Sequence, residues 1–257
     1  LFIAGIVPGL ALSGLFMLWI YLSSRRSKDQ FAIIDVPWSE RVRLLRYLLE
    51  PIAVFGVVMG TLYAGIATAT ESAALGLVVA FCLVAIQGKL TLALLDNCFV
   101  SSAKTTGMIL LIVLGAFVLN LALSLTGIGE AMTKWVTGFG LGRIQLLLLL
   151  ILFYLVLGMF MDTLSMMVAT IPLVFPVVSS VGVDPIWFGV FIVLMCELGL
   201  ITPPVGMNLF VVQGIRPDPG PVADVIRGAL PFAILMILFA LLLIVFPAIA
   251  TWLPTYM

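Results

Sequence analysis

A run of forty residues, 144–183, holds a single charged side chain, Asp162, near its middle. The hydrocarbon core of a bilayer is about 30 Å thick, and a helix needs roughly 20 residues to cross it. The run is therefore too long for one crossing. It either crosses twice or enters, turns and leaves on the side from which it came. Glycine and polar residues place the predicted turn at residues 158–165.

The whole chain has the composition of a polytopic helical membrane protein. Hydrophobic residues make up 63% of the sequence and charged residues only 9%, outside the range of soluble domains. The 12 basic and 12 acidic residues cancel, so no net charge favours nucleic acid as a partner. Histidine is absent and the three cysteines are widely spaced, so neither a zinc site nor a disulfide is predicted. Because the chain begins inside an apolar stretch, we expect it to be the C-terminal part of a longer protein.

A second apolar segment, residues 187–215, is interrupted by two adjacent prolines. Pro203 and Pro204 lack N–H donors and clash with the preceding turn, at about 3 kcal/mol each in a helix interior. The pair is compatible with a simple kink, but the glycine and threonine residues around it favour a full break between two half-helices. Such backbone is tolerated at membrane depth where it lines a cavity. Its carbonyls and half-helix C-termini suit Na⁺, and half-helix N-termini suit a carboxylate.

The basic residues distinguish between the possible topologies of the forty-residue run. With an even number of passes, ten of the twelve Lys and Arg residues fall on one face of the membrane; a single crossing leaves eight there. Basic residues concentrate on the cytoplasmic side, so the even number is favoured. Two full crossings and a re-entrant hairpin give the same sidedness, and both alternatives stay open.

Other segments are predicted to be membrane helices and their connections. Residues 29–50 are polar and then amphipathic, which indicates either an interfacial helix on the inner leaflet or an ordinary connector. Thr68 and Glu71 have the spacing of a capping box, so Glu71 is interpreted as a helix cap in preference to an ion ligand. The remaining apolar spans and arms are residues 1–22, 51–67, 69–88, 108–126 and 225–252.

Side-chain oxygens gather at the turn and at the break. Asp162 is either the cap of the following helix or an ion-binding carboxylate, because an ionisable group deep in the membrane costs about 2.5 kcal/mol or more and is functional by default. Glu197, just before the break, either lines the same site or forms a structural pair. The other oxygen-bearing side chains there are Thr163, Ser165, Thr202 and Asn208.

Three motifs surround these positions. Gly-Met-Phe-Met-Asp at 158–162 is followed by Ile-Pro-Leu-Val-Phe-Pro at 171–176 and by Gly-Val-Asp-Pro-Ile-Trp-Phe-Gly at 182–189. The break lies in Glu-Leu-Gly-Leu-Ile-Thr-Pro-Pro-Val-Gly-Met-Asn-Leu-Phe at 197–210. Together with the opening nine residues and Thr-Ala-Thr-Glu-Ser-Ala-Ala from Thr68, they resemble the large membrane subunit of tripartite ATP-independent periplasmic (TRAP) transporters over essentially the whole chain. The sequence departs from that pattern at Ala69, where the family often has proline.

The resemblance implies an all-α polytopic membrane protein that forms half of an elevator-type transporter, with a re-entrant helical hairpin and a broken transmembrane helix. By this likeness, residues 1–143 would be mainly scaffold helices and interfacial arm helices. Residues 144–215 would carry the transport-domain hairpin (144–180) and the broken helix (187–215). Residues 216–257 would form the last transmembrane helix.

The resemblance also implies a function. Family members are Na⁺-coupled symporters that import a small organic acid, such as a dicarboxylate or sialic acid, across the bacterial inner membrane. The expected partners are a periplasmic substrate-binding protein, a small four-helix membrane subunit, the N-terminal half of the same permease and the lipid bilayer. No cofactor is expected beyond Na⁺ as the coupling ion. The matching site positions are Gly158, Asp162, Thr163, Thr202, Pro203, Gly206 and Asn208, of which Gly158, Asp162, Thr163, Thr202 and Gly206 would surround the ion.

Two other classes remain open from the residues alone. An intramembrane, aspartyl-protease-like enzyme would use Asp162 and Glu197 as its acids, although neither lies in a Gly-x-Gly-Asp setting. A structural subunit of a membrane complex would use the same helices without binding an ion. The resemblance favours a transporter that is not an enzyme.

Overall fold

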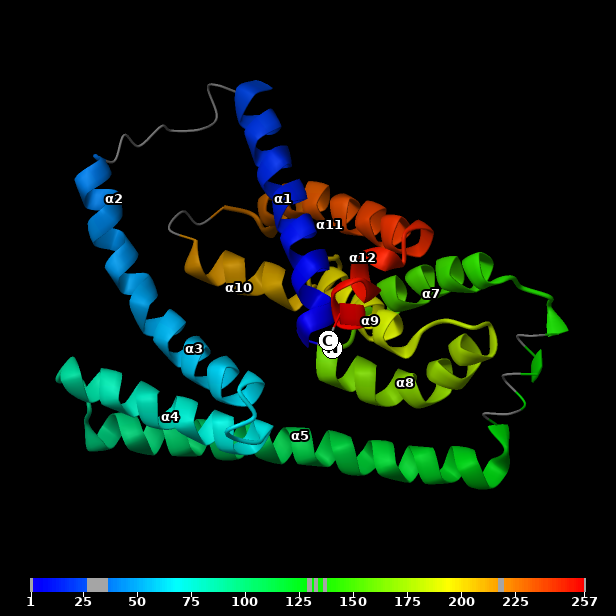
Figure 1. Ribbon diagram of the computed structural model, residues 1–257, viewed down its shortest axis with the longest axis horizontal. Coiled ribbons are helices and arrows are strands. Elements are labelled where there is room, and N and C mark those ends of the chain that lie inside the picture. Colours follow the sequence, from blue (N-terminus) through cyan, green and yellow to red (C-terminus); the bar gives the residue numbers. More distant parts are fainter. Residues whose placement is uncertain are drawn as a thin grey trace. The chain divides into compact units, whose positions relative to one another are not determined.

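The computed structural model describes residues 2–26, 37–128, 131, 134–135, 138–216 and 220–256, and the regular structure in these ranges is entirely helical (Figure 1). The chain divides into two compact units, residues 1–28 with 108–257 and residues 29–107, which are described separately. Five of the described helices are long and apolar enough to cross a bilayer, as the predicted polytopic membrane class requires. They are Phe2–Arg25, Ala69–Ile86, Leu92–Thr126, Thr163–Ser180 and Val222–Val245.

The smaller unit is built around the hairpin of α3 (Leu49–Tyr63) and α4 (Ala69–Ile86), which pack against each other. The predicted capping box is confirmed: the Thr68 N–H donates to Glu71 Oε2 over 2.8 Å, and the Glu71 N–H donates to Thr68 Oγ1 over 3.4 Å. The predicted amphipathic stretch contains the short helix α2 (Trp38–Leu45) and a 3-10 turn, η1 (Arg46–Leu48), which runs into α3. Its residues 29–36 lie outside the described part of the chain.

Helix α5 (Leu92–Thr126) is longer than the predicted span 108–126. It begins 16 residues earlier because nothing between residues 92 and 107 breaks a helix, and the Thr91 hydroxyl caps its start by accepting the Leu94 N–H over 3.2 Å. At 1.5 Å per residue its 35 residues extend about 50 Å, well beyond a bilayer core of about 30 Å. Residues 92–107 belong to the smaller unit and residues 108–126 to the larger one.

The larger unit is organised around α9 (Pro185–Leu200), which carries more buried residues than any other described helix. Helix α9 packs against α1 (Phe2–Arg26), α7 (Arg143–Gly158), α8 (Thr163–Ser180) and α11 (Val222–Val245). The chain ends with the short helices α12 (Ala248–Thr251) and η2 (Leu253–Tyr256). This core positions the turn before α8 and the end of α9.

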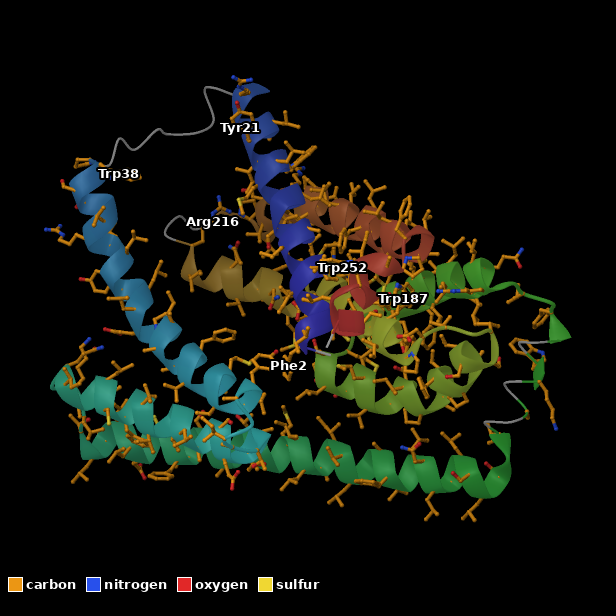
Figure 2. All side chains as sticks on the ribbon, in the orientation of Figure 1. Phe2, Tyr21, Trp38, Trp187, Arg216 and Trp252 are labelled. Atoms are coloured by element: carbon orange, nitrogen blue, oxygen red, sulfur yellow. The ribbon has the colours of Figure 1, made fainter. Side chains whose placement is uncertain are left out.

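The N-terminal end of α9 is held by side-chain hydrogen bonds to the backbone. The Asp184 carboxylate caps α9 by accepting the N–H groups of Ile186 and Trp187 over 2.8 and 2.9 Å, and Pro185 occupies the first turn, where no helical N–H is needed. The buried Trp187 ring donates its indole N–H to the Leu243 carbonyl of α11 over 3.1 Å (Figure 2).

Helix α11 ends earlier than the predicted last span, residues 225–252. Pro231 lies inside α11, whereas Pro247 follows its last turn, and the helix ends at Val245. The predicted continuation to residue 252 is therefore divided, with α12 as a separate short helix.

Candidate binding site at the turn and the break

The predicted turn lies between α7 and α8. Helix α7 ends at Gly158, the N–H groups of Phe160 and Met161 both donate to the Leu157 carbonyl over 3.0 Å, and α8 begins directly after Asp162. The Asp162 carboxylate accepts the Ser165 N–H over 3.1 Å and so caps α8. The capping role that the sequence left open for Asp162 is therefore confirmed. A cap does not exclude ion binding, because a carboxylate has more lone pairs than one N–H uses.

Thr163 is the first residue of α8, and its hydroxyl oxygen is buried without a hydrogen-bond partner among the described residues. An unsatisfied buried hydroxyl costs about 1–3 kcal/mol, so native proteins seldom retain one without a ligand, water or ion. The Thr163 hydroxyl is thus an oxygen that can bind a further group at the turn.

The interrupted segment consists of α9, which ends at Leu200, and α10 (Met207–Ile215). Between them the Thr202 hydroxyl donates to the Leu198 carbonyl over 2.6 Å, and the Thr202 N–H donates to the Gly199 carbonyl over 3.1 Å. The Leu200 carbonyl has lost its usual helical donor, because residue 204 is proline and carries no N–H.

Gly206 opens α10 in a left-handed backbone conformation, with φ of +37°, which favours glycine. A Cβ at this position would lie 2.8 Å from Leu209 Cδ1 and 2.9 Å from the Thr202 carbonyl oxygen. The Leu209 N–H also donates to the Gly206 carbonyl over 2.8 Å. Gly206 therefore lets α10 start directly against the break.

A backbone contact between α7 and α9 brings the turn and the break together. A Cβ on Gly158 or on Gly199 would lie 2.6 Å from the other residue's Cα, closer than real Cβ contacts. Both residues are buried. The C-terminal ends of α7 and α9 thus meet backbone to backbone, with Asp162 four residues beyond one glycine and Thr202 three residues beyond the other.

The other predicted site residues are less enclosed. Pro203 is half-buried, and Asn208 is exposed on α10, where it lines a crevice of about 450 Å³ between α10 and α11. Among the described residues no hydrogen bond joins the turn to the break. The glycine contact is their link.

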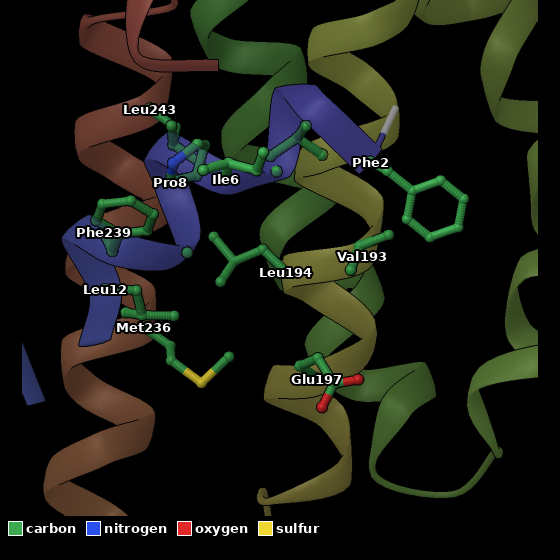
Figure 3. Close-up of a pocket in the computed structure, with 13 residues that line it drawn as sticks. Phe2, Ile6, Pro8, Leu12, Val193, Leu194, Glu197, Met236, Phe239 and Leu243 are labelled. Atoms are coloured by element: carbon green, nitrogen blue, oxygen red, sulfur yellow. The ribbon is translucent and has the colours of Figure 1, made fainter. Parts of the chain in front are cut away.

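Glu197 lies apart from this contact. It lines an apolar pocket of about 580 Å³ formed by residues of α1, α9 and α11, where it is the one charged lining residue (Figure 3). Residues two positions apart on an α-helix are separated by about 200° around its axis. Glu197 and Gly199 therefore project from nearly opposite faces of α9. This arrangement does not favour a pair of acids formed with Asp162, as an aspartyl-protease-like enzyme would require.

Sequence reasoning missed the pairing of Gly158 with Gly199. It also missed the buried hydrogen bond between Tyr154 of α7 and Thr170 of α8, whose hydroxyl oxygens lie 2.8 Å apart. The available signal for the glycine pairing was a glycine near the end of each of the two helices, Gly158 in α7 and Gly199 in α9. A tyrosine in an otherwise apolar stretch of α7, whose hydroxyl needs a partner when buried, was the signal for the hydrogen bond with Thr170.

Comparison with known proteins gives a consistent result. Residues 1–249 match the family described as "Tripartite ATP-independent periplasmic transporter, DctM component". The chain is 33% identical to the C4-dicarboxylate TRAP transporter large permease protein DctM of Pseudomonas aeruginosa, over 100% of this chain and 60% of that protein. It is 32% identical to the ectoine/5-hydroxyectoine permease protein UehC of Ruegeria pomeroyi, over 98% of this chain and 59% of that protein. It is 28% identical to the sialic acid TRAP transporter large permease protein SiaM of Vibrio cholerae, over 99% of this chain and 59% of that protein. The chain thus spans about 60% of the length of these relatives.

Proposed function

Because the chain belongs to the DctM component family of tripartite ATP-independent periplasmic transporters, we propose that it is the C-terminal part of a permease that imports a small organic acid together with Na⁺. It is an integral protein of the bacterial inner membrane, in keeping with its family and its five candidate spans. The relatives are named as transporter permeases and not as enzymes, which supports the expectation that this chain is not an enzyme.

The observation that carries the proposal is the contact of Gly158 with Gly199. It places two helix C-termini side by side, and each bears partial negative charge from its last carbonyls. Two such ends attract a cation, and the unsatisfied Thr163 hydroxyl, five residues beyond Gly158, is the kind of hard oxygen that Na⁺ binds. We therefore assign Na⁺ to this place, with oxygen ligands from Gly158, Asp162, Thr163, Thr202 and Gly206.

The substrate would bind beside the ion. Helices α8 and α10 start at the turn and at the break, so their first N–H groups present partial positive charge to a carboxylate. Pro203 and the Asn208 amide lie at the edge of this region. Two of the relatives are named for acids, C4-dicarboxylates and sialic acid, and this supports a carboxylate substrate.

The proposed mechanism is an elevator movement. Residues 144–215, with α7–α8 as a re-entrant hairpin and α9–α10 as a broken membrane helix, would move against a scaffold supplied mainly by residues 1–143, and residues 216–257 would form the last span. A family named ATP-independent needs another source of energy. Each charge moved through 100 mV provides about 2.3 kcal/mol, so roughly two net charges would support an accumulation of about three orders of magnitude.

The name "tripartite" supports partners of the kind the sequence implied. We propose a periplasmic binding protein that delivers the acid, a small four-helix membrane subunit, and the remaining part of the permease, which supplies the other half of the membrane site. The surrounding bilayer covers the many exposed apolar side chains.

Sidedness tests whether residues 144–183 make an even number of passes, as a re-entrant hairpin requires. Single cysteines at Ser179 and Gly214, both exposed positions, are labelled in intact cells with an impermeant thiol reagent. We expect Ser179→Cys to react from outside and Gly214→Cys to react only after permeabilisation. The opposite pattern would mean that residues 144–183 cross once, and the re-entrant hairpin would be wrong.

The function is tested by uptake into proteoliposomes. The complete transporter and its binding protein are assayed with an inward Na⁺ gradient and with K⁺ in its place. We expect Na⁺-dependent uptake that Asp162→Asn reduces at least tenfold at limiting Na⁺. Asp184→Asn is the matched control, because Asp184 also caps a helix of this unit but lies away from the turn. Equal losses of uptake in both variants would mean that Asp162 acts only as a helix cap and does not bind Na⁺.

A further inference from the structure

Helix α10 is weakly held by apolar packing. Of its nine residues only Leu209 is buried, whereas Val211, Val212 and Ile215 are each about half or more exposed. The crevice of about 450 Å³ between α10 and α11 leaves the packing of these two helices incomplete. Other contacts must therefore contribute to holding α10 in place.

Polar contacts fasten its far end. The Gln213 side-chain amide donates to the Gly220 carbonyl over 2.7 Å, and the Arg216 guanidinium pairs with the Asp224 carboxylate of α11 over 3.5 Å. Figure 2 shows Arg216 where the chain leaves α10. We call these four residues, Gln213, Arg216, Gly220 and Asp224, the α10 clasp.

Gly220 is part of the clasp because it leaves room for the guanidinium. A Cβ at this position would lie 2.7–2.8 Å from the Arg216 side chain. A larger residue would require the flexible Arg216 guanidinium to move from its present position beside Asp224, without removing either charge.

The near end of α10 touches the candidate ion site. A Cβ on Gly206 would meet both the Leu209 side chain and the Thr202 carbonyl oxygen, and the Leu209 N–H donates to the Gly206 carbonyl. A displacement of this nine-residue helix would therefore be transmitted to both backbone positions.

We propose that Gln213, Arg216 and Asp224 are positioning residues, which hold α10 against α11 and thereby set the geometry of Thr202 and Gly206 for Na⁺. The proposal rests on the proposed function. The ion pair of Arg216 and Asp224 lies at the surface, with side chains 30% and 44% exposed. Exposed ion pairs contribute about 1 kcal/mol at most, which changes an equilibrium constant about fivefold. Loss of the pair should weaken Na⁺ binding without abolishing it.

The placement of α10 is measured first, by distances between spin labels on the exposed positions Val211 and Leu230 in the complete transporter. The exposed Cys82 and Cys98 are replaced beforehand, and the buried Cys196 is retained. We expect Arg216→Gln, Asp224→Asn and Gly220→Ala to broaden the distance distribution, and the charge exchange Arg216→Asp with Asp224→Arg to restore it. Gly214→Ala is the matched control, because a Cβ there meets no atom within 4 Å. An unchanged distribution in all three variants would overturn the clasp.

The effect on the ion is measured second, as the Na⁺ concentration that gives half-maximal uptake. We expect Arg216→Gln and Asp224→Asn to raise it two- to fivefold, with the rate at saturating Na⁺ little changed and with recovery in the exchanged pair. Removal of an ion pair distant in the sequence, Arg43 with Glu40, by Arg43→Gln should leave this Na⁺ concentration unchanged. Altered distances with an unaltered Na⁺ dependence would refute the positioning role. Uptake without any Na⁺ dependence would refute the proposed function, and the distances would still decide whether the clasp exists.

Discussion

Two helical hairpins, α3–α4 and α7–α8, use the same local chemistry with different results. In each the second helix opens with a side-chain cap, from Thr68 in one and from Asp162 in the other. At the first turn the polar groups satisfy each other, since Glu71 Oε2 accepts both the backbone N–H and the hydroxyl of Thr68. At the second turn the Thr163 hydroxyl is buried and unpaired.

Burial separates the two hairpins further. Helix α3 has no buried residue and α4 has only Ser72 and Gly76, whereas α7 and α8 supply much of the core around α9. A cap is thus enough to form a turn. A candidate site needs in addition a buried position and a polar group left without a partner.

The largest difference in stability and uptake is expected between alanine substitutions of two glycines, Gly199 in α9 and Gly60 in α3. Gly199→Ala places a Cβ 2.6 Å from the Gly158 backbone, and neither helix can yield without separating from the other. Overpacking of this kind costs about 1–3 kcal/mol or more, so we expect a lower apparent melting temperature and loss of uptake. Gly60→Ala in α3 meets no atom within 4 Å and should be tolerated. Equal tolerance of both would show that the α7–α9 contact is not needed.

The unpaired hydroxyl gives the next largest effect. Thr163→Val removes a buried oxygen that no described group satisfies, so stability without Na⁺ should stay equal or rise, while Na⁺ affinity should fall about tenfold. Thr170→Val is the matched control. It leaves the Tyr154 hydroxyl unpaired and should lower stability by about 1–3 kcal/mol with little change in Na⁺ affinity. If Thr163→Val bound Na⁺ as the wild type does, this threonine would not be a ligand.

The smallest effect is expected at the first hairpin. Thr68→Ala removes the cap of α4, which costs about 1 kcal/mol, and Thr68→Ser should retain most of it. Both variants should keep the wild-type Na⁺ dependence of uptake. A change in that dependence would extend the ion site to the α3–α4 turn and remove the contrast between the two hairpins.

Local chemistry predicted the local features well. The capping box at Thr68 and Glu71, the turn after Gly158 and the interruption at Pro203 all depend on residues close together in the sequence. The predicted span 108–126 covers only the C-terminal part of α5 (Leu92–Thr126). A drop in hydropathy indicates where an apolar span begins, whereas the helix itself continues through the more polar residues before it.

Long-range contacts were not predictable in this way. Gly158 and Gly199 are 41 residues apart, and nothing in either neighbourhood specifies the other. The clasp was missed for a similar reason, since Arg216 and Asp224 read as ordinary surface charges until α10 and α11 are placed side by side. Spacing indicates how a helix begins or ends, whereas packing decides which ends meet.

The central claim is that Na⁺ binds where the α7–α8 turn meets the break after α9. The most direct measurement is the apparent melting temperature of the complete transporter as Na⁺ replaces K⁺ at constant ionic strength, because a ligand that binds only the folded state stabilises it as its concentration rises above Kd. We predict a Na⁺-specific rise that is lost in Asp162→Asn and retained in Asp184→Asn. The assignment would be contradicted by equal melting temperatures in Na⁺ and in K⁺. It would also be contradicted by a Na⁺-specific rise that survives in Asp162→Asn.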